Sequence, residues 1–359
     1  MEMKINIKYI VMFIISVLVI LFVYNDYFLY KTPIVKITNI ENDKNDSSEY
    51  YNQNIDGLIM NGEYKNKVVS LQNTTSISGV YDEQIHKNSE LFVELDDNGN
   101  VMGISNIKRD KYIAILLVLF IDLILIVSKL SGLKTLISLV INIIITIVSI
   151  VLFKNNYKTL SMLLLYIIVS IIFIVTSLYI TNGKSKKTLS AIIASIVSLF
   201  VSFTLSFLVI KLFGKNITIW TIDYIEAVYD YENFFYVSIL LCGLGAIMDI
   251  AITMSSSLNE LIDKDNKISV NNLIKSGKEI GKDVVGTMIN VMLFTVYTPI
   301  IPSVFLAIKN GMILFNALAY YGEIELIIVL CSSISIVLSI PISLYISVYI
   351  LKSRLKEVK

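Results

Sequence analysis

Polar residues with helical spacing interrupt one long hydrophobic segment of the chain. Asp249, Thr253 and Ser256 fall at positions i, i+4 and i+7, so they share one face of a helix. Gly243 and Gly245 precede them. A carboxylate inside a membrane segment is costly and indicates a site for a cation, a proton relay or a small polar solute. The two glycines permit either close approach of another helix or an unwound turn whose carbonyls coordinate a cation.

A second hydrophobic segment carries a similar polar face. Asp283, Gly286, Thr287 and Asn290 fall at positions i, i+3, i+4 and i+7. With a rise of about 1.5 Å per residue, Asp249 and Asn290 lie at similar depths from the cytoplasmic ends of their segments. We therefore expect the two polar faces to meet in the inner half of the membrane and form one site. Asp249 would lie at its floor and Asp283 nearer the cytoplasm.

These acids also have a purely structural interpretation, which the sequence leaves open. Asp249 could be hydrogen-bonded to a neighbouring helix, with nearby glycines serving helix packing. Asp283 could cap the second segment or pair with a cytoplasmic lysine. Asp122 is the other acid in the middle of an apolar run, and pairing with Asn142 would satisfy it.

The elements that position these residues are long hydrophobic spans. Hydrophobic residues make up 55% of the chain and charged residues 16%, which is typical of a membrane protein. Each apolar run is near the roughly 20 residues that a membrane-crossing helix needs. We expect eight such spans: 9–24, 112–127, 135–153, 160–180, 189–213, 234–258, 284–306 and 324–351.

The distribution of basic residues predicts the orientation of these spans. Most lysines and arginines near span ends fall on one side, which predicts that both termini are cytoplasmic. The short outer loops carry only Lys154, Lys158, Lys211, Lys215 and Lys309. The first span lacks a small-residue cleavage site, so residues 1–30 are expected to form an uncleaved anchor.

The polar segment 31–110 is expected to be an extracytoplasmic β-rich domain, either OB-like or a small sandwich. Alternating β-branched residues predict strands at 34–40 and 67–71. A third run, 91–95, leads into the turn sequence DDNGN. The Asn/Asp/Ser-rich stretch 41–54 is expected to be a loose loop.

Two further segments connect membrane spans. Apolar residues recur at helical spacing over 269–283, which predicts an amphipathic cytoplasmic helix with Ser269 as its N-cap. The acidic loop 214–233 is expected to be a solvated loop or an interfacial helix, with a cation-collecting mouth as the alternative.

Composition argues against several functional classes. A formal net charge of +1 gives no bulk attraction to nucleic acid. Two cysteines, both in apolar runs, and the single histidine His86 provide neither a disulfide framework nor a His-based metal site. No phosphate-binding P-loop motif is present. We therefore expect no cofactor and no enzymatic activity.

Several motifs resemble those of the YibE/F-like family of bacterial multi-pass membrane proteins. The most specific are GLGAIMDIA at 243–251, SLNEL at 257–261 and GKD at 281–283, followed by Asn290. The chain departs from the family pattern at YTPIIP, 297–302, where the family tends to have a glycine-containing turn. The resemblance implies an integral membrane protein with an outer β domain, often suspected of transport. Weaker matches are NGEYK at 61–65, GLK at 132–134 and TNGKS at 181–185.

Together these features predict an α-helical polytopic membrane protein with about eight transmembrane helices and a small extracytoplasmic β domain. Residues 111–359 would form a seven-helix transmembrane domain. The first function hypothesis is a transporter or permease-like protein for a cation or small polar solute. The alternative is a non-transporting envelope assembly or signalling component whose outer domain binds a ligand or partner. The expected partners are the lipid bilayer and a second YibE/F-like protein or a second copy of the chain.

Overall fold

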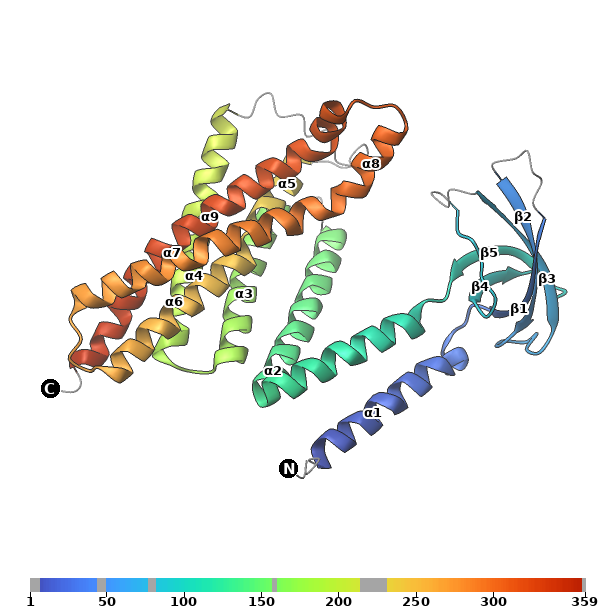
Figure 1. Cartoon of the computed structure of the whole chain (residues 1–359), viewed down its shortest axis with the longest axis horizontal. Helices are drawn as coiled ribbons and strands as arrows, with labels where there is room; N and C mark the ends of the chain where they lie inside the picture. Colours follow the sequence, from blue (N-terminus) through green and yellow to red (C-terminus); the bar gives the residue numbers. More distant parts are fainter. Residues whose placement is uncertain (1–6, 44–49, 77–81, 157–159, 214–230, 357–359) are drawn as a thin grey trace. The chain divides into compact units, whose positions relative to one another are not determined.

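The structure, a computed structural model, describes residues 7–43, 50–76, 82–156, 160–213 and 231–356 (Figure 1). The acidic stretch of the 214–233 loop lies almost wholly outside these residues. The chain divides into two compact units, Met1–Leu133 and Lys134–Lys359, which are described separately.

The first unit contains one five-stranded antiparallel sheet with the strand order β3-β2-β1-β4-β5. The two edge strands also approach each other, so the sheet curls into a barrel-like form. Its core is built from alternating β-branched and leucine side chains, including Val35, Ile37, Ile55 and Leu91. The strands are β1 (Ile34–Asp43), β2 (Tyr50–Ile59), β3 (Val68–Ser76), β4 (Glu90–Leu95) and β5 (Val101–Ile107).

Strands β1 and β2 correct the expectation of a loose loop at 41–54: residues 41–43 and 50–54 are in strands, and residues 44–49 lie outside the described residues. The Asn-rich start of β2 pairs with β3 along its whole length, and β1 continues to Asp43. Gln53 is fully buried there: its amide donates to the Ile85 carbonyl at 3.1 Å and its carbonyl accepts from the Ile85 N–H at 2.9 Å. Buried hydrogen bonds of this kind outweigh the low strand propensity of the local sequence.

The eight expected membrane spans do not appear as eight separate long helices. Among the described residues, six helical stretches are long and apolar enough to cross a membrane. The apolar part of α1 (Ile7–Tyr24) is shorter than these. The expected spans 112–127 and 135–153 lie in one element, α2 (Asp110–Asn156), which leaves helical geometry at Lys129 (φ 50°, ψ −125°). The kink separates the two runs, but helical hydrogen bonding resumes without an intervening loop.

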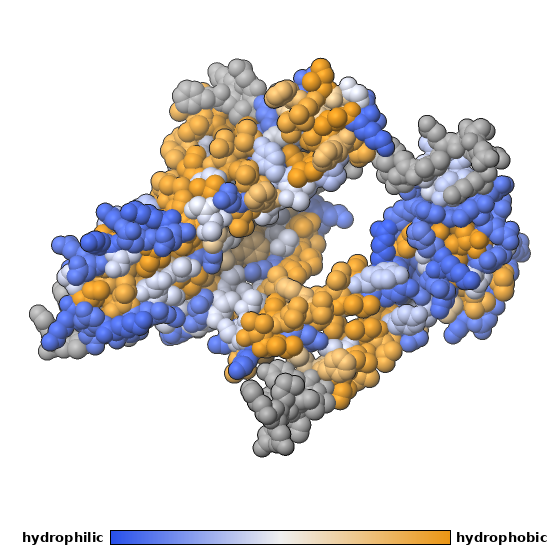
Figure 2. Space-filling model, in the orientation of Figure 1, coloured by the Kyte–Doolittle hydropathy of each residue, from blue (hydrophilic) through white to orange (hydrophobic). Residues whose placement is uncertain are grey.

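The remaining helices form the second unit together with the end of α2. Helices α5 and α6 make one span with a short interruption at Gly243, and α7, a 3₁₀ turn and α8 make another. Figure 2 shows hydrophobic residues over much of the visible helix surface. The bounds are α3 (Met162–Asn182), α4 (Lys186–Phe213), α5 (Tyr231–Cys242), α6 (Leu244–Lys264), α7 (Val270–Tyr297), α8 (Ile301–Lys309) and α9 (Leu314–Lys356).

Helices α4, α6 and α9 pack closely because serine side chains line their contacts. The Ser190 hydroxyl donates to Ser347 at 2.9 Å, and the Ser255 hydroxyl donates to the Lys187 carbonyl at 2.8 Å. Small hydroxyl side chains let helix backbones approach in a membrane, where hydrophobic burial gives no net advantage over lipid. Serines buried in α4 and α9 recur at three- to five-residue intervals: Ser190, Ser195, Ser198, Ser202 and Ser206, and Ser332, Ser335, Ser339, Ser343 and Ser347.

Candidate functional site

Helix α6 turns its apolar face inward and its predicted polar face outward. Ile247, Ile250, Met254 and Leu258 are buried, packing with residues of α4, α7 and α9. Asp249 lies on the opposite side of the helix and is exposed. Thr253 and Ser256, which share its face, are partly exposed.

Helix α7 has the same arrangement. Leu273, Gly277 and Gly281 are buried, whereas the four predicted polar-face residues, Asp283, Gly286, Thr287 and Asn290, are all exposed. The Thr287 hydroxyl donates to the Val284 carbonyl of its own helix at 2.9 Å. Ser269 caps α7 by accepting a hydrogen bond from the Asn272 N–H at 3.2 Å, as predicted. The helix continues without a break from the amphipathic stretch into the membrane span.

Apolar side chains join α6 to α7. Ile250, Met292 and Ile336 of α9 form one cluster, and Val284 and Met288 pack against it. Within the described residues, no hydrogen bond connects Asp249, Thr253 or Ser256 with the polar-face residues of α7. The two polar faces therefore lie on neighbouring helices and point away from the cores that hold the helices together.

The two carboxylates also lack the structural roles considered for them. Among the described residues, neither Asp249 nor Asp283 has a hydrogen bond or ion pair. The cap of α7 is Ser269, and Lys282 pairs with Glu279 at 3.0 Å. An aspartate at the centre of a transmembrane helix costs about 2.5–3.5 kcal/mol on insertion scales. This cost makes an exposed Asp249 a candidate for function.

The glycines of this region fall into two groups. A Cβ at Gly243 would lie 3.3 Å from the Ser335 Cβ, and one at Gly281 would clash with Ile340, so both glycines allow α9 to approach. Gly243 keeps right-handed helical dihedrals and its carbonyl accepts from the Ile247 N–H, so the backbone is not unwound there. Gly245 and Gly286 have open space where a Cβ would stand.

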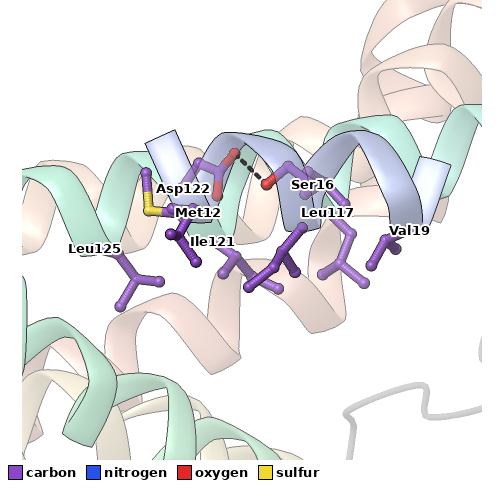
Figure 3. A pocket seen from close by; sticks show the side chains of 10 residues that line it. Met12, Ser16, Val19, Leu117, Ile121, Asp122 and Leu125 are labelled. Atoms are coloured by element: carbon purple, nitrogen blue, oxygen red, sulfur yellow. Dashed lines mark hydrogen bonds between the residues drawn. The ribbon is translucent and has the colours of Figure 1, made fainter. Parts of the chain in front are cut away.

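Asp122 has a partner that the sequence did not predict. In the first unit, the Ser16 hydroxyl of α1 donates to the Asp122 carboxylate at 2.8 Å (Figure 3). The pair lies at an apolar cavity of about 450 Å³, lined by residues such as Met12, Ile121 and Leu125. Asn142, the expected partner, instead donates to Ser177 at 2.8 Å.

A buried charged cluster at the base of the sheet was also missed. Lys108 is 1% exposed, and its ammonium lies 2.7 Å from Asp26 and 2.7 Å from Asp110. Glu90 of β4 lies 3.8 Å from the same ammonium. Burial alone would lower the pKa of Lys108, but the hydrogen bonds and charges of Asp110 and Asp26 outweigh it and raise the pKa. Asp26 follows α1 and Asp110 begins α2, so the cluster ties the sheet to both helices.

Two tyrosines complete this cluster. The Tyr27 hydroxyl donates to Glu90 at 2.7 Å, and the Tyr30 hydroxyl donates to Asp110 at 2.6 Å. Burial and the bond to Glu90 raise the pKa of Tyr27. The bond to Asp110 and burial raise the pKa of Tyr30. The clue in the sequence was the close succession of charged residues at 108–111, directly before an apolar run.

One further acid escaped the sequence reasoning. Glu325 is half-buried in α9, inside the membrane-spanning stretch Leu314–Ser353. It lies close enough to Cys242 and Tyr297 to interact electrostatically with both. In the sequence, an acidic residue directly before the apolar run that begins at residue 326 was the feature that could have indicated it.

Comparisons with known proteins agree with this architecture. A family model described as YibE/F-like protein matches residues 116–353, and one described as YibE/F family N-terminal domain matches residues 28–108. Neither the curated proteins nor the solved structures gave a match. The two matched segments cover the sheet and most of α2 to α9, and α1 lies outside them. The chain therefore belongs to the YibE/F-like family and is a multi-pass membrane protein with a β domain.

Proposed function

We propose that this protein has a non-enzymatic, permease-like role and binds a cation or a small polar solute along the polar residues of α6 and α7. The observation that carries the proposal is the exposure of Asp249 on a membrane-spanning helix without a partner among the described residues. Asn290 and Thr287 add amide and hydroxyl oxygens on the neighbouring helix. Oxygen ligands and a carboxylate suit a hard cation or a polar solute.

The proposed topology places this surface in the inner half of the membrane. This topology requires that α1 crosses the membrane and that α2 crosses it twice, once on each side of its kink at Lys129. Both termini and the start of α7 would then be cytoplasmic, and residues 31–110 would lie outside. Asp283, nearer the start of α7, would then meet an incoming solute before Asp249 does. The lysines at this end of α7 are consistent with an inner membrane surface.

Cation binding by the reconstituted full-length protein tests the proposal. Binding of Na⁺, K⁺, Mg²⁺ and Mn²⁺ would be measured by calorimetry, and uptake into vesicles by fluorescent indicators. Asp249→Asn with Asp283→Asn should weaken binding of the preferred ion at least tenfold. The matched control Asp265→Asn, in the exposed turn between the helices, should leave it unchanged. Equal binding by wild type and double variant, or no binding of any ion, would overturn the cation proposal.

The alternative, an envelope assembly or signalling component, is favoured by the Lys108 cluster. Because that cluster joins the sheet to the ends of α1 and α2, binding of a ligand to the sheet could act directly on both helices. Cysteine accessibility along α6 and α7 separates the two roles. A water path predicts periodic labelling that includes position 249, whereas a sealed surface predicts no labelling there.

A further inference from the structure

Helices α6 and α7 present a polar surface that nothing in the described chain covers. The two helices run side by side, and both pack on α9 (Figure 1). On the sides that face away from α9 lie exposed or partly exposed polar and glycine residues. We call this surface the α6–α7 face: Gly245, Asp249, Thr253 and Ser256 of α6, and Asp283, Gly286, Thr287 and Asn290 of α7.

No described part of the chain packs against the glycines of this face. At Gly277 and Gly281, side chains of α9 fill the space that a Cβ would take, so only glycine fits there. Gly245 and Gly286 have no atom of the chain within 4 Å of a Cβ position. Outward glycines next to hydroxyl and amide side chains are typical of helix–helix contacts in membranes, where backbones approach and polar groups bond across the contact.

The charges of α7 match those expected of a surface that meets a second copy of itself. Its first half carries exposed residues of both signs: Lys275, Lys278, Glu279, Lys282 and Asp283. In a twofold dimer the same patch meets itself, so it must carry both members of each pair. Lys282 already holds Glu279 at 3.0 Å, whereas Asp283 has no partner among the described residues. A lysine of a second copy would supply one.

The groups deeper in the membrane fit the same arrangement. The Asn290 amide both donates and accepts, so two Asn290 side chains can satisfy each other across a twofold axis. The hydroxyls of Thr253 and Ser256 can donate to a carboxylate of the facing copy. Lipid offers no such donors at this depth.

We propose that the α6–α7 face is the interface of a homodimer, so that the polar site between the copies is closed only when two chains meet. This inference rests on the proposed function only for the identity of the bound solute. Each copy would contribute Asp249 and Asn290 to one enclosed site. A single copy would leave those groups facing lipid.

Disulfide crosslinking of the full chain in native membranes tests the interface. Cys242 and Cys331 would first be replaced by serine, and single cysteines introduced at 253, 287 and 290. The matched controls are Val201→Cys and Leu205→Cys, which are 46% and 43% exposed on α4. Oxidation should give dimers at the face positions and none at the controls. No dimer at any face position, or equal dimer at the controls, would overturn the proposal.

A second experiment separates the interface from the proposed function. Gly245→Leu and Gly286→Leu fill space that is open within one chain, so each copy should fold normally. The dimer fraction in vesicles, counted by single-molecule photobleaching, should fall at least tenfold, with Val201→Leu unchanged. An unchanged dimer fraction in both glycine variants overturns the interface. If the interface fails while Asp249→Asn with Asp283→Asn still weakens cation binding at least tenfold, the proposed function stands alone. Crosslinks from the face positions to a different protein, which do not form with the purified chain, would also overturn the proposal that a second copy covers the face.

Discussion

Individual charges in this chain occur in two contrasting environments. Lys108, Asp26 and Glu90 are buried, Asp110 is partly buried, and each is within ion-pair distance of an opposite charge. Asp249 and Asp283 are exposed on helices, without a partner among the described residues. Replacing one member of a buried set of charges leaves an uncompensated charge in the interior and lowers stability strongly. Breaking an ion pair that is exposed to solvent lowers stability little. The two environments therefore predict different effects of substitution.

The Lys108 cluster should dominate the stability of the first unit. Lys108→Met leaves Asp26, Asp110 and Glu90 without their shared cation, so we expect a loss of about 3–5 kcal/mol. Lys282→Met breaks only the exposed pair with Glu279 and should cost less than about 1 kcal/mol. Urea unfolding of both variants in micelles, followed by near-ultraviolet circular dichroism, would measure the difference. Equal midpoints for the two variants would contradict the role of the cluster.

The same cluster predicts a loss of stability at alkaline pH. The pKa values of Tyr27, Tyr30 and Lys108 are raised in the folded protein, so folding favours their protonated forms. This stabilisation is complete below about pH 10, the range of their unfolded pKa values, and is lost as pH rises through the folded values. The share of tyrosinate absorbance that comes from Tyr27 and Tyr30, obtained by difference from Tyr27→Phe with Tyr30→Phe, should therefore appear late and accompany unfolding. In Tyr27→Phe with Tyr30→Phe, the tyrosine contribution to this dependence should disappear.

Among the elements, α7 packs one side against α9 and leaves its polar side exposed. The helix begins at its predicted cap, Ser269, and its 3.6-residue period places Gly277 and Gly281 against α9. The same period places Gly286 outward. The residue spacing correctly predicted which residues share a face of α7. Which of these faces contacts another helix is decided by α9, which is far away in the chain.

Two glycine variants of α7 test this assignment. Gly281→Leu inserts a side chain into Ile340 of α9 and should destabilise the second unit by about 1–3 kcal/mol or more. Gly286→Leu meets no atom of its own chain and should change the stability of a single copy little. Thermal unfolding of both variants in dilute detergent would compare them. A larger loss for Gly286→Leu would contradict the packing described for α7.

Strand β2 and helix α2 show where local patterns were insufficient. The Asn-rich start of β2 looked like a loop because its hydrogen-bond partners, β3 and Ile85, lie outside the local window. In α2, polar residues around Lys129 suggested a loop, but a single non-helical residue is enough to bend the helix there.

For the whole molecule, the proposed topology is the most direct prediction. In a chain without its native cysteines, Lys87→Cys in the β domain should react with a membrane-impermeant maleimide on intact cells. The control, Lys267→Cys between α6 and α7, should react only after the cells are opened. Both positions are exposed, so accessibility within the protein does not limit either reaction. The opposite pattern would invert the proposed orientation.

The sequence by itself determined the membrane class, the β domain and the residues of the two polar faces, because hydropathy and periodicity are local properties. Family membership was also recognisable from short motifs, chiefly the segment from Gly243 to Asn290. Only the tertiary structure decided that these faces turn away from α9, that Asp122 meets Ser16, and that Lys108 holds three carboxylates. These contacts join residues far apart in the chain, and the direction of a helix face depends on which neighbours bury the other side.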